Sequence, residues 1–329
     1  MALRVCHSIL INSATPFAFR VASQSQSLHS TPKTLCNFLV LRAKMSTDGE
    51  GLKNSPSSAK VIDSHVHVWA SLQEAEKYPY FPGQEPTLTG HADFLLQCME
   101  EAGVDGALIV QPINHKFDHS YVTSVLKRYP SKFSGCCLAN PAEDGSGIKQ
   151  LEDLVSKMTN TIGKAMFSKA GELGVPVGFM CMKGLNLHFA EIEELCTEYP
   201  STTVLIDHLG FCKPPINDGE SLAFSNLLKL SKFPQVYLKF SALFRVSREA
   251  YPYKDLSSSL SQVVSSFGAD RIMWGSDFPY VIPECGYKAG KEAVSLIVER
   301  ASLSSSELDW IMGGTVMQLF RGHWISSST

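Results

Sequence analysis

Apolar and polar positions follow two alternating periods along most of the chain. Short apolar runs with β-branched residues predict strands at 61–69, 106–111, 132–139, 175–180, 203–208, 236–240 and 271–276. Apolar residues at three- and four-residue spacing predict helices at 91–102, 118–129, 189–198, 221–230 and 256–267, and further helices from about Gly286 to Trp324. Alternating units over roughly 250 residues predict an α/β fold, a (β/α)8 TIM-like barrel. A doubly wound open sheet is the weaker alternative, because no glycine-rich phosphate loop follows an early strand.

The segment from Ser146 to Leu173 departs from this alternation. Its apolar residues keep one helical stripe with no β-branched run: Ile148, Leu151, Val155, Met158, Ile162, Met166 and Leu173. The pattern predicts one long helix kinked near Gly163, or two helices in tandem, where the fourth barrel strand should lie. We therefore expect seven strands and two unpaired strand edges. This gap raises one non-enzymatic alternative, an inactive isoform that acts only as a binding protein.

Charge is unevenly distributed over the 329 residues, whose formal net charge is −3. Residues 1–47 hold five of the 29 basic residues and no acidic one, which leaves 24 basic against 32 acidic groups and a charge of −8 for the remainder. An acidic domain disfavours a nucleic-acid partner, and no stretch has the length that crosses a bilayer. We expect a small-molecule substrate. The nine cysteines show no disulfide framework, so we expect reduced thiols.

The first 47 residues are rich in serine, carry scattered arginine and lack acid, which is typical of an organelle transit peptide. A chloroplast is favoured over a mitochondrion, because serine and threonine outnumber arginine. An internal start at Met45 would instead give a cytosolic form. Residues 48–59 are predicted to be a linker, and residues 60–325 the barrel domain.

The first predicted strand of the barrel carries the most distinctive polar pattern. Side chains along a strand alternate between its faces, so Asp63, His65 and His67 are expected on one face. The apolar residues Ile62, Val66 and Val68 are expected on the other. Two imidazoles two residues apart can reach a single divalent ion, and a nearby carboxylate suits the same chemistry.

Two further strands end in polar residues. His208 ends one strand within the run Asp207-His208-Leu209-Gly210, and Asp277 follows another within Gly-Ser-Asp-Phe-Pro. Enzyme sites on such barrels lie at the carboxyl ends of the strands. The pattern therefore predicts that His65, His67, His208 and Asp277 meet at one rim. Taken singly, Asp207-His208 is better explained as a polar strand end, and Asp277 is equally well explained as a turn residue before proline.

These motifs resemble the amidohydrolase-2 family of the amidohydrolase superfamily. D-x-H-x-H at 63–67, D-H-L-G at 207–210 and G-S-D-x-P at 275–279 carry the resemblance, and Gly313–Phe320 is similar to the family's terminal helix. Ile109–Pro112 and Asn140-Pro141 are similar to the lactonase group with 2-pyrone-4,6-dicarboxylate and sugar-lactone hydrolases. The resemblance covers about residues 60–325. It implies a (β/α)8 barrel, hydrolysis of a cyclic ester, and one divalent metal or none. The fifth strand lacks the histidine that many members have there, so a binuclear site is not expected.

The resemblance also implies roles for individual residues. Asp277 is expected as the general base on water, with His65, His67 and Asp277 holding one divalent metal (zinc), which is weakly bound or absent. His208 is expected to polarise the ester carbonyl. Four residues are candidates for binding substrate, the first two through a carboxylate and the others through its ring: Lys183, Lys239, Trp69 and Tyr280. The alternative activity is metal-dependent decarboxylation, which other members of the branch catalyse.

Overall fold

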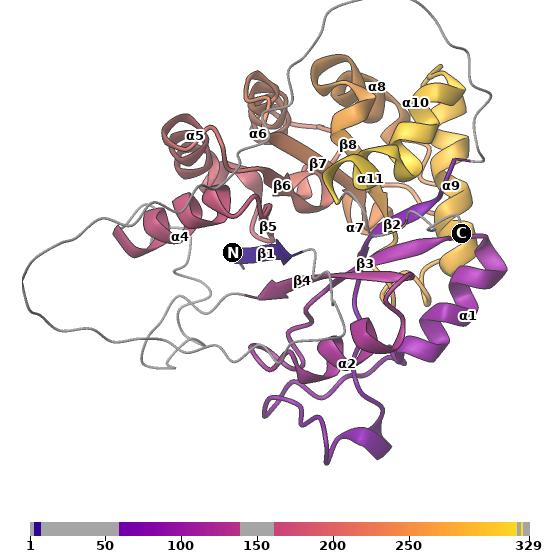
Figure 1. Ribbon diagram of the computed structural model, residues 1–329. Coiled ribbons are helices and arrows are strands. Elements are labelled where there is room, and N and C mark those ends of the chain that lie inside the picture. Colours follow the sequence, from indigo (N-terminus) through magenta and orange to yellow (C-terminus); the bar gives the residue numbers. More distant parts are fainter. Residues whose placement is uncertain (1–2, 8–58, 139–160, 321–323, 325–329) are drawn as a thin grey trace, which may run out of the picture. The chain divides into compact units, whose positions relative to one another are not determined.

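A computed structural model describes residues 3–7, 59–138, 161–320 and 324 of the chain. Contacts divide the chain into a unit of residues 1–11 and 59–329 and a second unit, 12–58, which lies outside the described residues. The first unit contains one eight-stranded sheet in the order β2-β3-β4-β1-β5-β6-β7-β8 (Figure 1). No helix in the described ranges has the length and apolarity to cross a bilayer.

The strands β2 to β8 confirm the seven that the sequence predicts. Their bounds are β2 Ile62–Val66, β3 Gly106–Val110, β4 Phe133–Leu138, β5 Val177–Phe179, β6 Val204–Ile206, β7 Val236–Ser241 and β8 Ile272–Gly275. Neighbours pair in parallel from β2 to β4 and from β5 to β8. The ring closes between its first and last strands, where Val66 pairs in parallel with Phe278 and the His67 N–H donates to the Phe278 carbonyl at 2.7 Å. The predicted barrel architecture is therefore confirmed.

The fourth barrel position, between β4 and β5, is occupied by β1 (Leu3–His7). This strand runs antiparallel to both neighbours, with Cys6 opposite Cys136 and Arg4 opposite Gly178. The expected total of seven strands is thus corrected to eight, because the open edges of β4 and β5 offer unpaired N–H and carbonyl groups that an extended segment satisfies. In the ranges that the structure describes, no parallel strand fills this position.

Helices follow most strands and confirm the predicted alternation. They are α1 Ala92–Ala102, α2 Ser120–Arg128, α4 Thr161–Glu172, α5 Phe189–Glu198, α6 Asp218–Lys229, α7 Leu243–Val246, α8 Leu256–Phe267, α9 Tyr287–Arg300, α10 Ser305–Asp309 and α11 Thr315–Leu319. α1 shows how the sequence sets such bounds: His91 accepts a hydrogen bond from the Asp93 N–H at its start, and Gly103 ends it at φ 63°. α4 confirms the later part of the helix predicted from Ser146, whose first residues, 146–160, lie outside the described residues.

Two apolar clusters hold the barrel together. The larger lies between strands and helices, whereas the smaller joins side chains of five strands to the C-terminal segment: Ile62, Leu108, Val110, Cys136, Leu205, Met273, Val316, Phe320 and Trp324. Side chains of strands that are not neighbours in the sheet meet only inside the ring. Trp324 Nε1 also donates to the carbonyl of Lys132, just before β4. The C-terminal segment therefore packs at the amino ends of the strands, opposite the end where the predicted site lies.

β2 contains an irregularity in its register against β3, between Asp63 and Val66. Ile62 belongs to the inner cluster, whereas Val66 and Val68 belong to the outer one. The expectation that these three share a face is therefore wrong for Ile62, because a bulge reverses the alternation of side chains. Val66 and Val68 do lie opposite the histidines, as predicted.

Candidate active site

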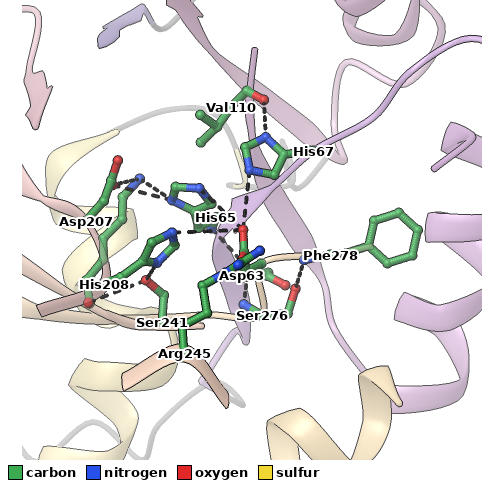
Figure 2. Close-up of polar contacts among 12 residues, drawn as sticks. Asp63, His65, His67, Val110, Asp207, His208, Ser241, Arg245, Ser276 and Phe278 are labelled. Carbon is green, nitrogen blue, oxygen red and sulfur yellow. Dashed lines mark hydrogen bonds and ion pairs between the residues drawn. The ribbon is translucent and has the colours of Figure 1, made fainter. Parts of the chain in front are cut away.

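Four predicted residues meet at the carboxyl ends of the strands, and Figure 2 labels the three histidines among them. The Nε2 atoms of His67, His65 and His208 lie 3.3, 3.8 and 3.9 Å from one atom, Oδ1 of Asp277. Every one of these side chains is at most 7 % exposed. The predicted convergence on one rim is thus present as three imidazoles around one buried carboxylate oxygen.

The backbone takes unusual turns where the two later motifs leave their strands. His208, Leu209 and Gly210 have φ values of 51°, 50° and 61°, and Asp277 has a φ of 64°. The left-handed region costs free energy for residues other than glycine, so such turns persist only where surrounding contacts fix them. The Asp277 N–H donates to the His65 carbonyl at 2.9 Å, which provides one such contact.

The second ring nitrogen of His67 and of His208 is anchored by a group from a neighbouring strand. His67 Nδ1 lies 2.9 Å from the carbonyl oxygen of Val110, which only accepts, so this nitrogen carries the proton. His208 Nδ1 shares a hydrogen bond of 2.7 Å with the Ser241 hydroxyl. Figure 2 shows these contacts at both rings. They hold each ring with Nε2 toward Asp277.

Asp277 is ionised in this setting. Burial opposes its negative charge, but the imidazoles of His208, His67 and His65 together hold the pKa of the carboxyl well below its usual value. Its other oxygen, Oδ2, accepts a hydrogen bond of 2.8 Å from Nε of Arg245. No sequence motif indicated Arg245, which reaches the site from α7 after β7.

His65 is neutral. Burial lowers the pKa of its imidazole well below the ordinary value, and the positive charges of Lys239 and His208 lower it further, against the opposing effect of Asp207. A neutral imidazole keeps the lone pair that a metal ligand requires.

Asp63 does not join this group, so the expectation that it shares a face with His65 and His67 is wrong. Its Oδ1 accepts hydrogen bonds of 3.0 Å from the N–H groups of His65 and Ser276, and its Oδ2 accepts one of 2.9 Å from the Tyr287 hydroxyl. Burial raises the pKa of Asp63 to about 6. Asp63 therefore fastens β2 to the chain that follows β8 and to α9.

The four residues predicted to bind substrate lie in different settings. Lys239 is 1 % exposed, and its Nζ lies 3.0 Å from Oδ1 of Asp207. Tyr280 lies 5.9 Å from the His67 ring and 6.1 Å from Trp69, between ring centroids. Trp69 is buried and donates to the Leu88 carbonyl, whereas Lys183 is exposed in the loop after β5. Contact of these residues with substrate stays a prediction.

Comparison with known proteins agrees with this site. Residues 62–322 match the family model described as Amidohydrolase. The chain belongs to the amidohydrolase family. It is 26% identical over 234 residues to the 4-sulfomuconolactone hydrolase of Rhizobium radiobacter, covering 66% of this chain and 75% of that protein. It is 29% identical over 244 residues to the L-fucono-1,5-lactonase of Burkholderia ambifaria, with 66% and 80% covered.

Solved structures support the fold. An amidohydrolase from Burkholderia multivorans with bound zinc superposes with a TM-score of 0.59, at 18% identity, over 80% of this chain and 99% of that one. The family and the barrel that the sequence motifs indicated are therefore confirmed, and so is the expectation that the chain is a hydrolase of this family.

The buried group of this amidohydrolase has the donors of a metal site. His65, His208 and Asp277 each offer one ligand atom, and these atoms lie within 4.8 Å of one another. Imidazole nitrogens and an ionised carboxylate are ligands that zinc prefers. The residues therefore fit one divalent ion. His67, which the sequence assigned to the metal together with His65 and Asp277, lies beside this group through its contact with Asp277.

Proposed function

We propose that this amidohydrolase opens the ring of a small lactone, derived from a sugar or bearing a carboxylate, by attack of water. The observation that carries the proposal is the convergence of His65, His67 and His208 on one oxygen of Asp277. The relatives whose names describe lactone hydrolysis support the same chemistry.

Asp277 is the proposed general base. Its ionised Oδ1 takes a proton from water as the water oxygen bonds to the lactone carbonyl carbon. When the ring C–O bond breaks, the same carboxyl returns the proton to the departing alkoxide, so the product is a hydroxy acid. The Arg245 hydrogen bond to Oδ2 fixes the orientation of the carboxylate during both transfers.

His208 is proposed to stabilise the negative charge that develops on the carbonyl oxygen. A neutral His208 donates from Nε2 only if its Nδ1 is unprotonated and accepts a hydrogen bond from another group. The Ser241 hydroxyl, 2.7 Å away, both donates and accepts, so it supports this tautomer as well as the one with a lone pair on Nε2.

One divalent metal is part of the proposal, with zinc as the ion because the Burkholderia multivorans amidohydrolase binds it. His65 and Asp277 would hold it, with His67 alongside. His208 would be a third ligand only in the tautomer with a lone pair on Nε2, in which it does not donate to the carbonyl oxygen. Such an ion supplies Lewis-acid polarisation of the ester carbonyl.

The test uses the full chain and a panel of sugar and pyrone lactones, followed by proton release. We expect turnover of at least one lactone, and a fall in kcat of roughly 100-fold or more in Asp277→Asn, from loss of the general base. Asp218→Asn, an exposed aspartate in α6, is the matched control and should keep the wild-type rate. Failure to hydrolyse any lactone, or equal rates for Asp277→Asn and wild type, would overturn the proposal.

A further inference from the structure

A buried pair of opposite charges lies next to Nδ1 of His65, on the side of the ring away from Asp277. Asp207 follows β6 and Lys239 lies within β7, and each is 1 % exposed. The distance from Lys239 Nζ to Asp207 Oδ1 is 3.0 Å. Both groups also approach the ring nitrogen of His65 that faces away from Asp277: Asp207 Oδ1 lies 3.4 Å and Lys239 Nζ 3.3 Å from Nδ1.

The two partners would fix opposite forms of the His65 ring. A carboxylate only accepts and therefore requires a proton on Nδ1, whereas an ammonium only donates and requires a lone pair there. A neutral imidazole carries one proton, so the partner that bonds Nδ1 decides whether Nε2 has a lone pair. Only the form with a proton on Nδ1 leaves Nε2 able to bind a metal ion.

The shortest of the three distances joins Lys239 to Asp207. The ammonium thus lies at ion-pair distance from the carboxylate, and it also lies at hydrogen-bond distance from His65 Nδ1. A carboxylate has further lone pairs with which to accept the His65 Nδ1 proton. Lys239 also offsets a charge that would be costly to bury alone. Figure 2 shows Asp207 beside His65, away from Val110, which has the corresponding place beside His67.

We propose that Asp207 is a positioning residue that holds His65 with its proton on Nδ1, and that Lys239 serves to balance Asp207 and not to bind substrate. This inference rests on the proposed metal-assisted hydrolysis. A hydrogen bond from the outer nitrogen of a metal-bound histidine commonly changes metal affinity 10- to 100-fold.

The first experiment measures the tautomer directly in zinc-free protein. Histidine labelled with ¹⁵N distinguishes a protonated from an unprotonated ring nitrogen, and His65→Gln identifies its signals. We expect a protonated Nδ1 in His65. An unprotonated Nδ1 would overturn the inference, since Lys239 would then be the bonding partner, while leaving the lactonase proposal intact.

The second experiment measures zinc dissociation constants by competition with a chromophoric chelator. Asp207→Asn should weaken zinc binding about 10- to 100-fold, and Lys239→Met should leave it unchanged or tighter. In Asp207→Asn the Lys239 ammonium is left without its carboxylate and could itself repel the metal. The double variant Asp207→Asn, Lys239→Met removes this ammonium as well, so it separates that repulsion from the loss of the Asp207 hydrogen bond. We expect zinc binding by the double variant to stay weak.

Zinc affinity restored to the wild-type value in the double variant would overturn the role of Asp207. A rise in KM for a carboxylated lactone in Lys239→Met, at unchanged zinc affinity, would overturn the role of Lys239. If wild type binds no zinc, the metal part of the proposed function fails as well, and the isotope experiment still decides the tautomer.

Discussion

Arg245 donates a hydrogen bond of 2.8 Å from Nε to Oδ2 of Asp277, while the other oxygen of that carboxylate faces three imidazoles. The guanidinium also lies over the ring of Tyr280, 4.9 Å from its centroid. One oxygen of Asp277 is thus held in place and the other is directed at the site. The orientation of the proposed base depends on a residue from a different βα unit.

Arg245→Met should therefore lower kcat by about 100-fold, because a misplaced reacting group costs rate even when it is chemically intact. Steady-state kinetics on an uncharged lactone would measure this effect separately from any loss of charge attraction. Arg248→Met is the matched control, since Arg248 pairs with Glu220 and with the Pro214 carbonyl away from Asp277. Equal kcat values for both variants would contradict the role of Arg245.

The sequence predicted the four central residues because each lies at or just after the end of a strand with a recognisable pattern. Arg245 and Asp207 are different cases. Arg245 reaches the site only because Ala242, with a φ of 49°, turns the chain from β7 into α7. Asp207 was visible in its motif, but its contact with His65 depends on β2 and β6 facing each other inside the ring. Neither contact follows from the spacing of residues along a helix or strand, so sequence periodicity could not predict it.

Gly275, the first residue of the Gly-Ser-Asp-Phe-Pro motif, is explained by close packing. A Cβ added there would lie 2.8 Å from His65 Cβ and 3.0 Å from Ser241 Cβ. Gly275→Ala should lower the free energy of unfolding by about 1–3 kcal/mol, the usual cost of overpacking, and lower kcat by displacing His65. Denaturant unfolding and kinetics measure the two effects.

Gly219→Ala serves as the control for that variant. A Cβ at this exposed position in α6 has Asn217 Oδ1 at 3.4 Å as its nearest atom, so the added methyl group makes an ordinary contact without strain. Its stability and kcat should stay near those of wild type. If Gly275→Ala also keeps the stability and kcat of wild type, then close packing of β8 against His65 does not require a glycine at this position.

Asp63 gives a prediction about pH. Its pKa is about 6 in the folded chain against 3.8 ordinarily, so the folded state binds this proton more tightly than the unfolded state does. The resulting stabilisation is complete below about pH 3.8 and is lost as the pH rises through about 6. Asparagine at this position cannot ionise.

The free energy of unfolding of wild type, relative to Asp63→Asn, should therefore fall between about pH 4 and about 6 and then level off. Urea unfolding of zinc-free protein at a series of pH values measures the difference. Asp218→Asn, at an exposed site, should show no such trend. If the difference in free energy of unfolding between wild type and Asp63→Asn is constant or rises over this pH range, the pKa of Asp63 is not raised in the folded chain.

The strand β1 is the part of the fold that the sequence did not predict. Local pattern indicated a leader at residues 1–47, and only the unpaired edges of β4 and β5 give Leu3–His7 a place in the sheet. That leader, with its chloroplast destination, stays a prediction. A mature chain that begins after residue 47 would lack β1. Cleavage of the leader and completion of the sheet by Leu3–His7 therefore exclude each other in one chain.

Val5→Pro tests whether β1 completes the barrel. Val5 lies opposite both Cys137 and Val177, and proline there removes a backbone donor from a strand with a neighbour on each side. Each buried backbone group left unpaired costs about 1–3 kcal/mol, so the melting temperature should fall. Val5→Ile keeps the donor and the strand preference and should melt like wild type.

A chain that starts at Met45 should be destabilised at least as much as Val5→Pro. If it melts like the full chain, β1 does not stabilise the sheet.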